Sequence, residues 1–217
     1  MVAVIVPAYN EAERIGAVLT AVTAAKLADQ IIVVSDGSFD GTAGVARKFP
    51  GVQVIELPRN AGKGAAMSAG VAATRAPIIA FVDADLVGLR GEHVDQIIRP
   101  ILDGRCDVCI GVFRGGKFWS DSAQRIAPYI SGQRAMRRHY FEGIPHIGEM
   151  RSGVEVALNT YAKRMHARVQ RTVLRGVSNT FKENKMGLVK GAAARAKMWA
   201  EIGRAVVRLR RRRLRRR

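Results

Sequence analysis

Short apolar runs alternate with helical patterns through the first half of the chain. In the first helical pattern, Ile15, Val18 and Val22 recur at the spacing of one helix face. The predicted strands are residues 2–6, 31–34, 52–55, 78–82 and 108–112, and the predicted helices are residues 11–25, 42–48, 63–73 and 92–102. Strands and helices that alternate at this pitch form parallel sheets with right-handed crossovers. The sequence therefore predicts an α/β fold with a Rossmann-like, doubly wound, mostly parallel sheet, whose ligand lies at the carboxyl ends of the strands.

The second half of the chain is less regular. Residues 154–165 have helical periodicity, residues 168–174 could form an edge strand, and residues 187–209 carry one apolar stripe at helical spacing. Such a stripe more often packs on a core than on a membrane. We expect one folded domain over residues 1–186, followed by an amphipathic helix and arginine-rich tail over residues 187–217.

Much of the net charge of +18 lies in this tail, which reads RAVVRLRRRRLRRR from Arg204 onward. A run of this kind repels itself and is solvated by default. Beside an anionic membrane each basic residue would contribute about 1 kcal/mol of attraction, so peripheral attachment is a second reading. A nucleic-acid binder would spread basic and aromatic residues over a folded face. The tail has no aromatic residue, which counts against that class.

No apolar run approaches the roughly 18 residues that a membrane-spanning helix needs. The first residues, VAVIVPAYN, have neither a basic leader region nor a small-residue cleavage site. We therefore expect a cytoplasmic protein. If the arginine-rich tail binds anionic lipids, the protein would also attach peripherally to the inner face of the plasma membrane. Cys109 lies in the predicted strand over residues 108–112 and Cys106 lies just before it, and no second cysteine pair completes a zinc site, so we expect ordinary buried thiols.

Two carboxylates follow the fourth predicted strand, in the segment FVDAD. Alternation along an extended chain places Asp83 and Asp85 on the same side. The two would repel each other unless a cation lay between them, and Mg²⁺ and Mn²⁺ prefer such oxygen ligands. The segment predicts a divalent cation site, and a solvated loop after a core strand is the alternative.

The ends of the first two predicted strands also carry polar residues. The first ends in PAYNE, where Asn10 or Glu11 could face a ligand or cap the next helix. The second ends in SDGSFDGT, where Asp36 can accept hydrogen bonds from a base or a ribose. A turn followed by a helix capped by Asp40 or Thr42 is the alternative.

Lys63 lies between two glycines at the start of a predicted helix, in NAGKGA. Free N–H groups and the helix dipole would add to its charge and attract an anion. The segment is not a P-loop, because Leu57 stands in place of the first glycine and Lys63 is not followed by Ser or Thr. A solvated surface lysine is the alternative.

In their order and spacing, VPAYNE, VSDGSFDGT, NAGKGAA and FVDADL resemble family 2 glycosyltransferases of the GT-A type over roughly residues 2–90. A weaker resemblance continues through SGQRAMRR and RSGVEVALN, which look like acceptor-side segments of small bacterial members similar to dolichyl-phosphate mannosyltransferases and glucosyl-3-phosphoglycerate synthases. The resemblance implies a GT-A fold and transfer of a sugar from a UDP- or GDP-linked donor, with Mg²⁺ or Mn²⁺ as cofactor.

The resemblance also implies roles for single residues. The nucleotide would be bound by Pro7, Tyr9, Glu11, Asp36, Lys63 and Asp83. The metal would be held by Asp83 and Asp85, and the cation at Asp85 would neutralise the departing diphosphate. The sequence departs from the usual pattern at Ser35, which replaces the first of two paired acids, and at Asn179, where many relatives supply a histidine to the metal.

Glu155 is the candidate general base if the acceptor is a hydroxyl group. A polyprenyl phosphate or another phosphorylated acceptor is already anionic and needs no base, and arginines suit its phosphate. The candidates for that contact are Arg134, Arg137 and Arg138. The alternative for Glu155 is a glutamate at a helix start that the helix dipole favours. The alternative for the three arginines is a solvated basic turn.

Sugar nucleotidyltransferases are a competing enzyme class with a similar sheet. They typically begin with a glycine-rich loop and a lysine after the first strand. Residues 6–11, VPAYNE, contain no glycine, which favours the transferase reading.

Overall fold

The computed structural model of the protein describes residues 1–114 and 131–179. Within them a seven-stranded sheet has the order β3-β2-β1-β4-β7-β6-β8. Its strands are β1 (Val2–Ala8), β2 (Gln30–Ser35), β3 (Val52–Glu56), β4 (Ile78–Phe81), β6 (Val108–Arg114), β7 (Arg134–Arg137) and β8 (Val169–Arg175). Strands β1 to β4 are parallel to one another, and β8 is parallel to β6 at the sheet edge, as its sequence predicted.

Strand β7 is the exception, because it runs antiparallel to both neighbours, β4 and β6. A small second sheet pairs β5 (Leu86–Val87) with β9 (Ser178–Asn179), also antiparallel. The mostly parallel α/β fold is thus confirmed, and β5, β7 and β9 are additions that the periodicity did not predict. Strands β5 and β9 have two residues each, and β7, with the sequence RAMR, has arginines at both ends where β4 is apolar throughout.

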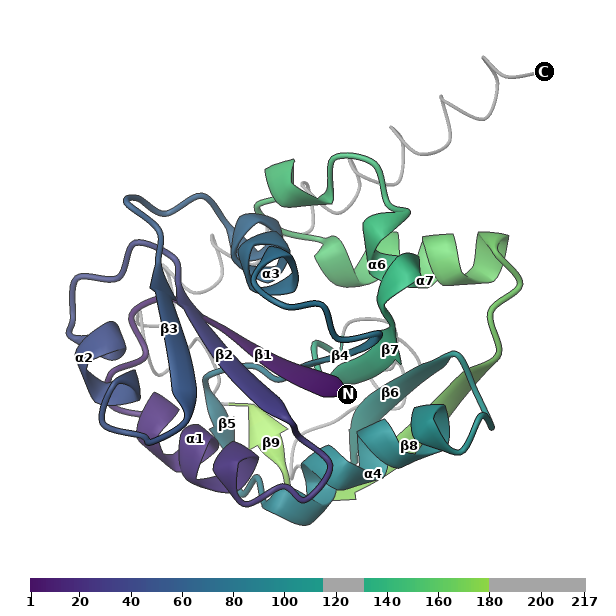
Figure 1. The fold of residues 1–217 in the computed structure, drawn as a ribbon, viewed down its shortest axis with the longest axis horizontal. Coiled ribbons are helices and arrows are strands. Elements are labelled where there is room, and N and C mark those ends of the chain that lie inside the picture. The colour runs from purple at the N-terminus through teal and green to yellow at the C-terminus, as the bar shows by residue number, and fades with distance from the viewer. Residues whose placement is uncertain (115–130, 180–217) are drawn as a thin grey trace.

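Helices cover both faces of the sheet (Figure 1). They are α1 (Ile15–Thr23), α2 (Thr42–Ala46), α3 (Lys63–Ala72), α4 (Gly91–Leu102), α6 (Arg138–Glu142) and α7 (Val154–Arg164), with a 3₁₀ helix η2 (Ile147–Glu149) before α7. Along β1, Val4 and Val6 pack with α1 and α4, whereas Ile5 packs with α3 and α7. Each such fully buried aliphatic side chain stabilises the fold by about 1.5–3 kcal/mol.

Cys106 and Cys109 are free and buried, as predicted. Burial raises the pKa of the Cys109 thiol to about 11, which makes it a poor nucleophile at neutral pH. The predicted helix and tail over residues 187–217 lie outside the described residues.

Among the residues that the structure describes, no helix combines the length and the apolar character that crossing a membrane requires.

Candidate active site

The loops that follow β1 and β2 are joined by hydrogen bonds at the carboxyl edge of the sheet. The backbone N–H of Asn10 donates to the Ser38 hydroxyl at 3.1 Å, and the Asn10 side chain accepts from the N–H of Phe39 at 3.1 Å. The N–H of Glu11 donates to the Thr42 hydroxyl at 2.9 Å. The predicted first helix begins at Glu11, whose N–H is used by one of these bonds. In the structure α1 begins later, at Ile15.

Asp40 precedes the N-cap of α2 by one residue and forms a hydrogen bond with the first residue of the helix. Its carboxylate accepts the N–H of Thr42 and, from the neighbouring loop, the N–H of Ala12, both at 3.0 Å. The N-cap position itself is Gly41, with φ +87°. The prediction of Asp40 or Thr42 as the N-cap is therefore wrong, although Asp40 accepts the N–H of the first residue of α2.

Asp36 is buried and binds the loop that leads into α3. Its two carboxylate oxygens accept the N–H groups of Ala61 at 2.7 Å and Gly62 at 2.8 Å. Its neighbour Gly37 has φ +65°, and a Cβ there would lie 2.4 Å from the backbone of Arg59. A carboxylate can accept about four hydrogen bonds, so each Asp36 oxygen can accept one more.

The start of α3 is packed against the segment before α7. The N–H of Lys63 donates to the Arg151 carbonyl at 3.3 Å, and the N–H of Gly64 donates to the Met150 carbonyl at 2.9 Å. A Cβ on Gly64 would lie 2.1 Å from the Ile147 carbonyl oxygen, so glycine permits this approach. The expectation of free N–H groups at this helix start is wrong for these two amides, because the neighbouring segment already uses them. The Lys63 side chain remains as the group that can meet an anion.

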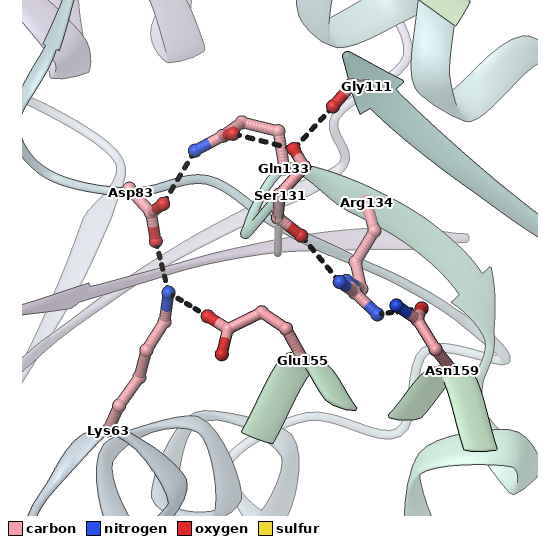
Figure 2. A network of polar contacts seen from close by, with 8 residues as sticks. All are labelled: Lys63, Asp83, Gly111, Ser131, Gln133, Arg134, Glu155 and Asn159. Atoms are coloured by element: carbon pink, nitrogen blue, oxygen red, sulfur yellow. Dashed lines mark hydrogen bonds and ion pairs between the residues drawn. The ribbon is translucent and has the colours of Figure 1, made fainter. Parts of the chain in front are cut away.

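That side chain lies between two carboxylates from different parts of the chain (Figure 2). The Lys63 ammonium is 2.6 Å from Asp83 Oδ1, just after β4, and 2.7 Å from Glu155 Oε1, in the first turn of α7. The exposed fractions of the Lys63, Asp83 and Glu155 side chains are 28%, 17% and 13%. The structure thus brings together three side chains that the sequence proposed separately.

Electrostatic attraction within this cluster outweighs the cost of burial. Burial alone lowers the pKa of Lys63, but the charges of Asp83 and Glu155 raise it well above its usual range. Burial alone raises the pKa of Glu155, but the Lys63 charge lowers it below the usual value. At neutral pH Lys63 is therefore a cation and Glu155 an anion.

The second oxygen of Asp83 is held by a residue that the sequence analysis did not single out. Gln133 is 1% exposed, and its amide donates to Asp83 Oδ2 at 2.7 Å. The Ser131 hydroxyl donates to the Gln133 amide oxygen at 3.0 Å and also contacts the Gly111 carbonyl. A Cβ on Gly132 would lie 2.3 Å from Asp83. The start of β7 is therefore a close-fitting support for Asp83.

Arg134 adds a buried cation beside this cluster, at 1% exposure. Its guanidinium donates to Asn159 Oδ1 at 3.1 Å and to the Ser131 carbonyl (Figure 2). Among the described residues, its Nε has no hydrogen-bond partner. Burial lowers the pKa of Arg134, and the charges of Glu155 and Asp83 oppose that shift.

Arg137 and Arg138 lie at the other end of β7. Arg134 pairs with Phe81 at the carboxyl end of β4, whereas Arg137 pairs with Ile78 at its amino end. Arg137 forms an ion pair with Asp107 at 3.5 Å, and Arg138 forms one with Glu142 at 2.6 Å. The structure does not bring these two arginines to the cluster, because a strand of four residues separates them from it.

The remaining sequence-predicted residues lie around the carboxyl edge. Pro7 pairs with Val34 within the sheet. Glu11 is 9% exposed and forms an ion pair with Arg14 at 3.1 Å. Tyr9 is 44% exposed, and its ring meets the exposed ring of Phe39 edge to face, with centroids 6.4 Å apart.

The two carboxylates Asp83 and Asp85 fit a divalent cation that takes its other ligands from phosphate oxygens and water. Asp85 is half-buried and directly precedes β5. Leu86 of β5 pairs with Asn179 of β9. Asn179, which stands where many relatives supply a histidine, therefore lies beside the acidic segment. Within residues 1–114 and 131–179, no three His, Cys, Asp or Glu side chains gather into a metal cage. Mg²⁺ commonly uses one or two carboxylates and completes its shell with water and phosphate oxygens.

Comparison with known proteins places these residues in a family context. The family model described as glycosyl transferase family 2 matches residues 3–159. The undecaprenyl-phosphate 4-deoxy-4-formamido-L-arabinose transferase of Serratia proteamaculans is 31% identical over 188 residues, which are 75% of this chain and 57% of the relative. The dolichyl-phosphate beta-glucosyltransferase of Trichomonas vaginalis is 40% identical over 94 residues, 37% of this chain and 28% of the relative. The chain thus spans less than two thirds of the length of these curated relatives.

A solved structure has the same fold over nearly the whole chain. Glucosyl-3-phosphoglycerate synthase from Mycobacterium tuberculosis, in complex with Mn²⁺, UDP and glucosyl-3-phosphoglycerate, superposes with a TM-score of 0.69 at 23% identity. The match covers 94% of this chain and 80% of that protein. The fold is therefore the GT-A fold of that glycosyltransferase.

Proposed function

The chain belongs to glycosyltransferase family 2, and we propose that it transfers a sugar from a UDP- or GDP-linked donor to a phosphorylated acceptor, with Mg²⁺ or Mn²⁺ as cofactor. The observation that carries this proposal is the Lys63, Asp83 and Glu155 cluster at the carboxyl edge of the sheet. Family membership favours this reading over a sugar nucleotidyltransferase or a nucleic-acid binder.

Asp83 and Asp85 are the proposed ligands of the cation. A cation held there would act as a Lewis acid on the donor diphosphate. The Lys63 ammonium would stabilise the same developing negative charge, since a fixed cation in a partly desolvated site acts strongly on a leaving group. The mycobacterial synthase of the same fold was solved in complex with Mn²⁺ and UDP, which supports this reading.

The nucleoside would lie over the joined loops after β1 and β2. Pro7 lies near the end of β1, Tyr9 and Glu11 lie in the loop after it, and Asp36 directly follows β2. The exposed Tyr9 ring offers a face for a base, and Asp36 offers acceptor sites for its edge. The hydrogen bonds between the loops would keep this surface in place before the nucleotide binds.

The acceptor would approach Glu155 and Arg134. Arg134 is a buried cation with an unpaired Nε among the described residues, which suits an anionic group. Two curated relatives carry undecaprenyl phosphate and dolichyl phosphate in their names, which supports a polyprenyl phosphate. For a hydroxyl acceptor, ionised Glu155 would serve as the general base. Arg137 and Arg138 are not part of this proposed site, because they lie at the opposite end of β7.

The experiment is an assay of sugar transfer with radiolabelled UDP- and GDP-sugars, polyprenyl phosphate and 3-phosphoglycerate, with Mn²⁺ or with EDTA. The proposal expects a labelled product with at least one donor and acceptor pair, formed with Mn²⁺ and lost in EDTA. Equal product formation in EDTA would contradict the metal role, and no product with any pair would count against the transferase.

A further inference from the structure

The Lys63 ammonium contacts Asp83, which is one of the two proposed ligands of the cation. Both Asp83 oxygens are engaged, Oδ1 by the Lys63 ammonium at 2.6 Å and Oδ2 by the Gln133 amide at 2.7 Å. Gln133 is fixed in turn by the Ser131 hydroxyl at 3.0 Å. A cation that approaches Asp83 through Oδ1 must therefore compete with Lys63.

Without Asp85, four charged side chains of the cluster sum to a formal charge of zero. Two cations, Lys63 and Arg134, face two anions, Asp83 and Glu155, and all four interact electrostatically. A divalent cation added to this set would meet the Lys63 charge at close range, in a site where water screens charges poorly. A nucleoside diphosphate would bring the negative charge that restores the balance.

The geometry lets the Lys63 side chain move without the helix that carries it. The backbone at the start of α3 donates hydrogen bonds to the Met150 and Arg151 carbonyls. The Lys63 ammonium, in contrast, lies at the end of a flexible four-carbon stem. Glu155 binds the same ammonium at 2.7 Å. The ammonium can thus leave Asp83 and remain paired to Glu155.

We propose that Lys63 is an internal counter-cation that leaves Asp83 for the donor diphosphate, and so makes binding of the divalent cation conditional on the nucleotide. This inference rests on the proposed function and adds a role for Lys63 beyond contact with the phosphate. Coupling between two ligands is reciprocal, so the divalent cation strengthens nucleotide binding by the same factor.

The test measures Mn²⁺ binding to the full chain from the electron paramagnetic resonance signal of free Mn²⁺, alone and with UDP or GDP. In the wild type we expect one nucleotide to tighten Mn²⁺ binding by at least about tenfold, within the usual range of coupling. Lys63→Met should bind Mn²⁺ alone about tenfold more tightly than the wild type and lose most of the coupling. Lys63→Arg keeps the charge and should keep the coupling, and Lys48→Met, at an exposed lysine on the loop after α2, should match the wild type.

Lys63→Met leaves two facing carboxylates and could fold poorly without metal. The double variant Lys63→Met/Glu155→Gln removes one cation and one anion, and it should also bind Mn²⁺ alone more tightly than Glu155→Gln does. If the wild type shows coupling but neither Lys63→Met protein gains Mn²⁺ affinity over its parent, the inference is overturned and the proposed function stands. If the wild type binds neither nucleotide with Mn²⁺, the proposed function fails and the inference fails with it.

Discussion

Gln133 shows how one buried amide can define a carboxylate's position. Its Nε2 is 2.7 Å from Asp83 Oδ2, and its own oxygen accepts from Ser131. An amide that donates to a carboxylate forms a charge-assisted hydrogen bond, which is stronger than a neutral one. Asp83 therefore has a fixed orientation, with Oδ1 directed at Lys63.

Replacing Gln133 by leucine should weaken nucleotide binding in the presence of Mn²⁺ by about tenfold, since a hydrogen bond to a charged group contributes about 1.5–3 kcal/mol. Isothermal titration with UDP or GDP measures this. Gln96→Leu, at an exposed position of α4, is the matched control and should leave the affinity unchanged. Equal affinities for both variants would show that Asp83 needs no such support.

The charged residues of the candidate site could be identified from the sequence, whereas the amide side chains that bind them could not. Lys63, Asp83 and Glu155 were proposed from three separate segments, and the structure places them within hydrogen-bond distance. Gln133 and Asn159 were missed, because an amide carries no charge pattern and no strand was predicted for residues 134–137. The roles of the nucleotide-binding and acceptor-binding residues remain predictions.

At the scale of elements, the start of α3 depends on glycines for close packing. A Cβ on Gly64 would lie 2.1 Å from the Ile147 carbonyl oxygen, whereas a Cβ on Gly44 in α2 would meet no atom within 4 Å. The contact joins the Lys63 helix to η2, which leads into the helix of Glu155.

Gly64→Ala should lower the free energy of unfolding by about 2–3 kcal/mol, because the added methyl group forces the backbone apart. Gly44→Ala should raise it by about 0.5–1 kcal/mol, as is usual within a helix. Urea unfolding followed by circular dichroism measures both. A Gly64→Ala protein as stable as Gly44→Ala would mean that α3 and η2 separate without cost.

Asp107 ties the start of β6 to the residue before β8. Its carboxylate accepts from the Arg168 side chain at 3.0 and 3.1 Å and from the Arg168 N–H at 3.0 Å. The Arg168 hydrogen bonds lower the pKa of Asp107 from 3.8 to about 2, against the opposing effect of burial. A lowered carboxyl pKa means that the folded state favours the ionised form, so the stabilisation is complete above pH 3.8 and is lost as the pH falls through about 2.

Asp107→Asn should therefore lower the free energy of unfolding by about 1 kcal/mol at pH 7, since the partner arginine is largely in water. The difference from the wild type should shrink between about pH 4 and pH 2. Denaturant unfolding at a series of pH values measures this, and Asp103→Asn, at an exposed carboxylate, is the control. A difference that stays constant with pH would contradict the ion-pair account.

Strands β1, β2 and β4 could be predicted because each contains a run of apolar residues, and helices α1 and α4 because each is long enough to show its repeat. Strand β7 could not, since its segment RAMR has arginines at both ends and its pairing between β4 and β6 joins residues distant in sequence. The prediction of free amides at the start of α3 failed for a similar reason. The Met150 and Arg151 carbonyls that use them come from a segment about 90 residues later.

At the scale of the whole molecule, the candidate site is built from elements that meet at one edge of the sheet. Asp83 follows β4, Gln133 precedes β7, Lys63 begins α3, and Glu155 lies in the first turn of α7 (Figures 1 and 2). Ligand sites at the carboxyl ends of strands are the rule in open α/β sheets. The fold thereby collects residues from four separate segments into one charged cluster.

The arginine-rich tail, proposed from the sequence alone as a membrane attachment, calls for a test on the full chain. A truncation after Gly203 removes the tail's nine arginines. At about 1 kcal/mol of attraction for each basic residue near an anionic surface, the full chain should pellet with phosphatidylserine vesicles at low salt, and the truncated chain should pellet far less. Neutral phosphatidylcholine vesicles are the control. Equal pelleting of both chains would remove the tail from membrane attachment.

We propose that Asp83 and Asp85 bind a divalent cation together with a nucleoside diphosphate. The most direct test of this proposal is calorimetric titration of the wild type and Asp83→Asn/Asp85→Asn with UDP and with GDP, each in Mn²⁺ and in EDTA. We expect Mn²⁺ to strengthen binding of at least one nucleotide to the wild type by about tenfold or more, and we expect the double variant to lose this gain. An equal gain in the double variant, or no gain in the wild type, would contradict it.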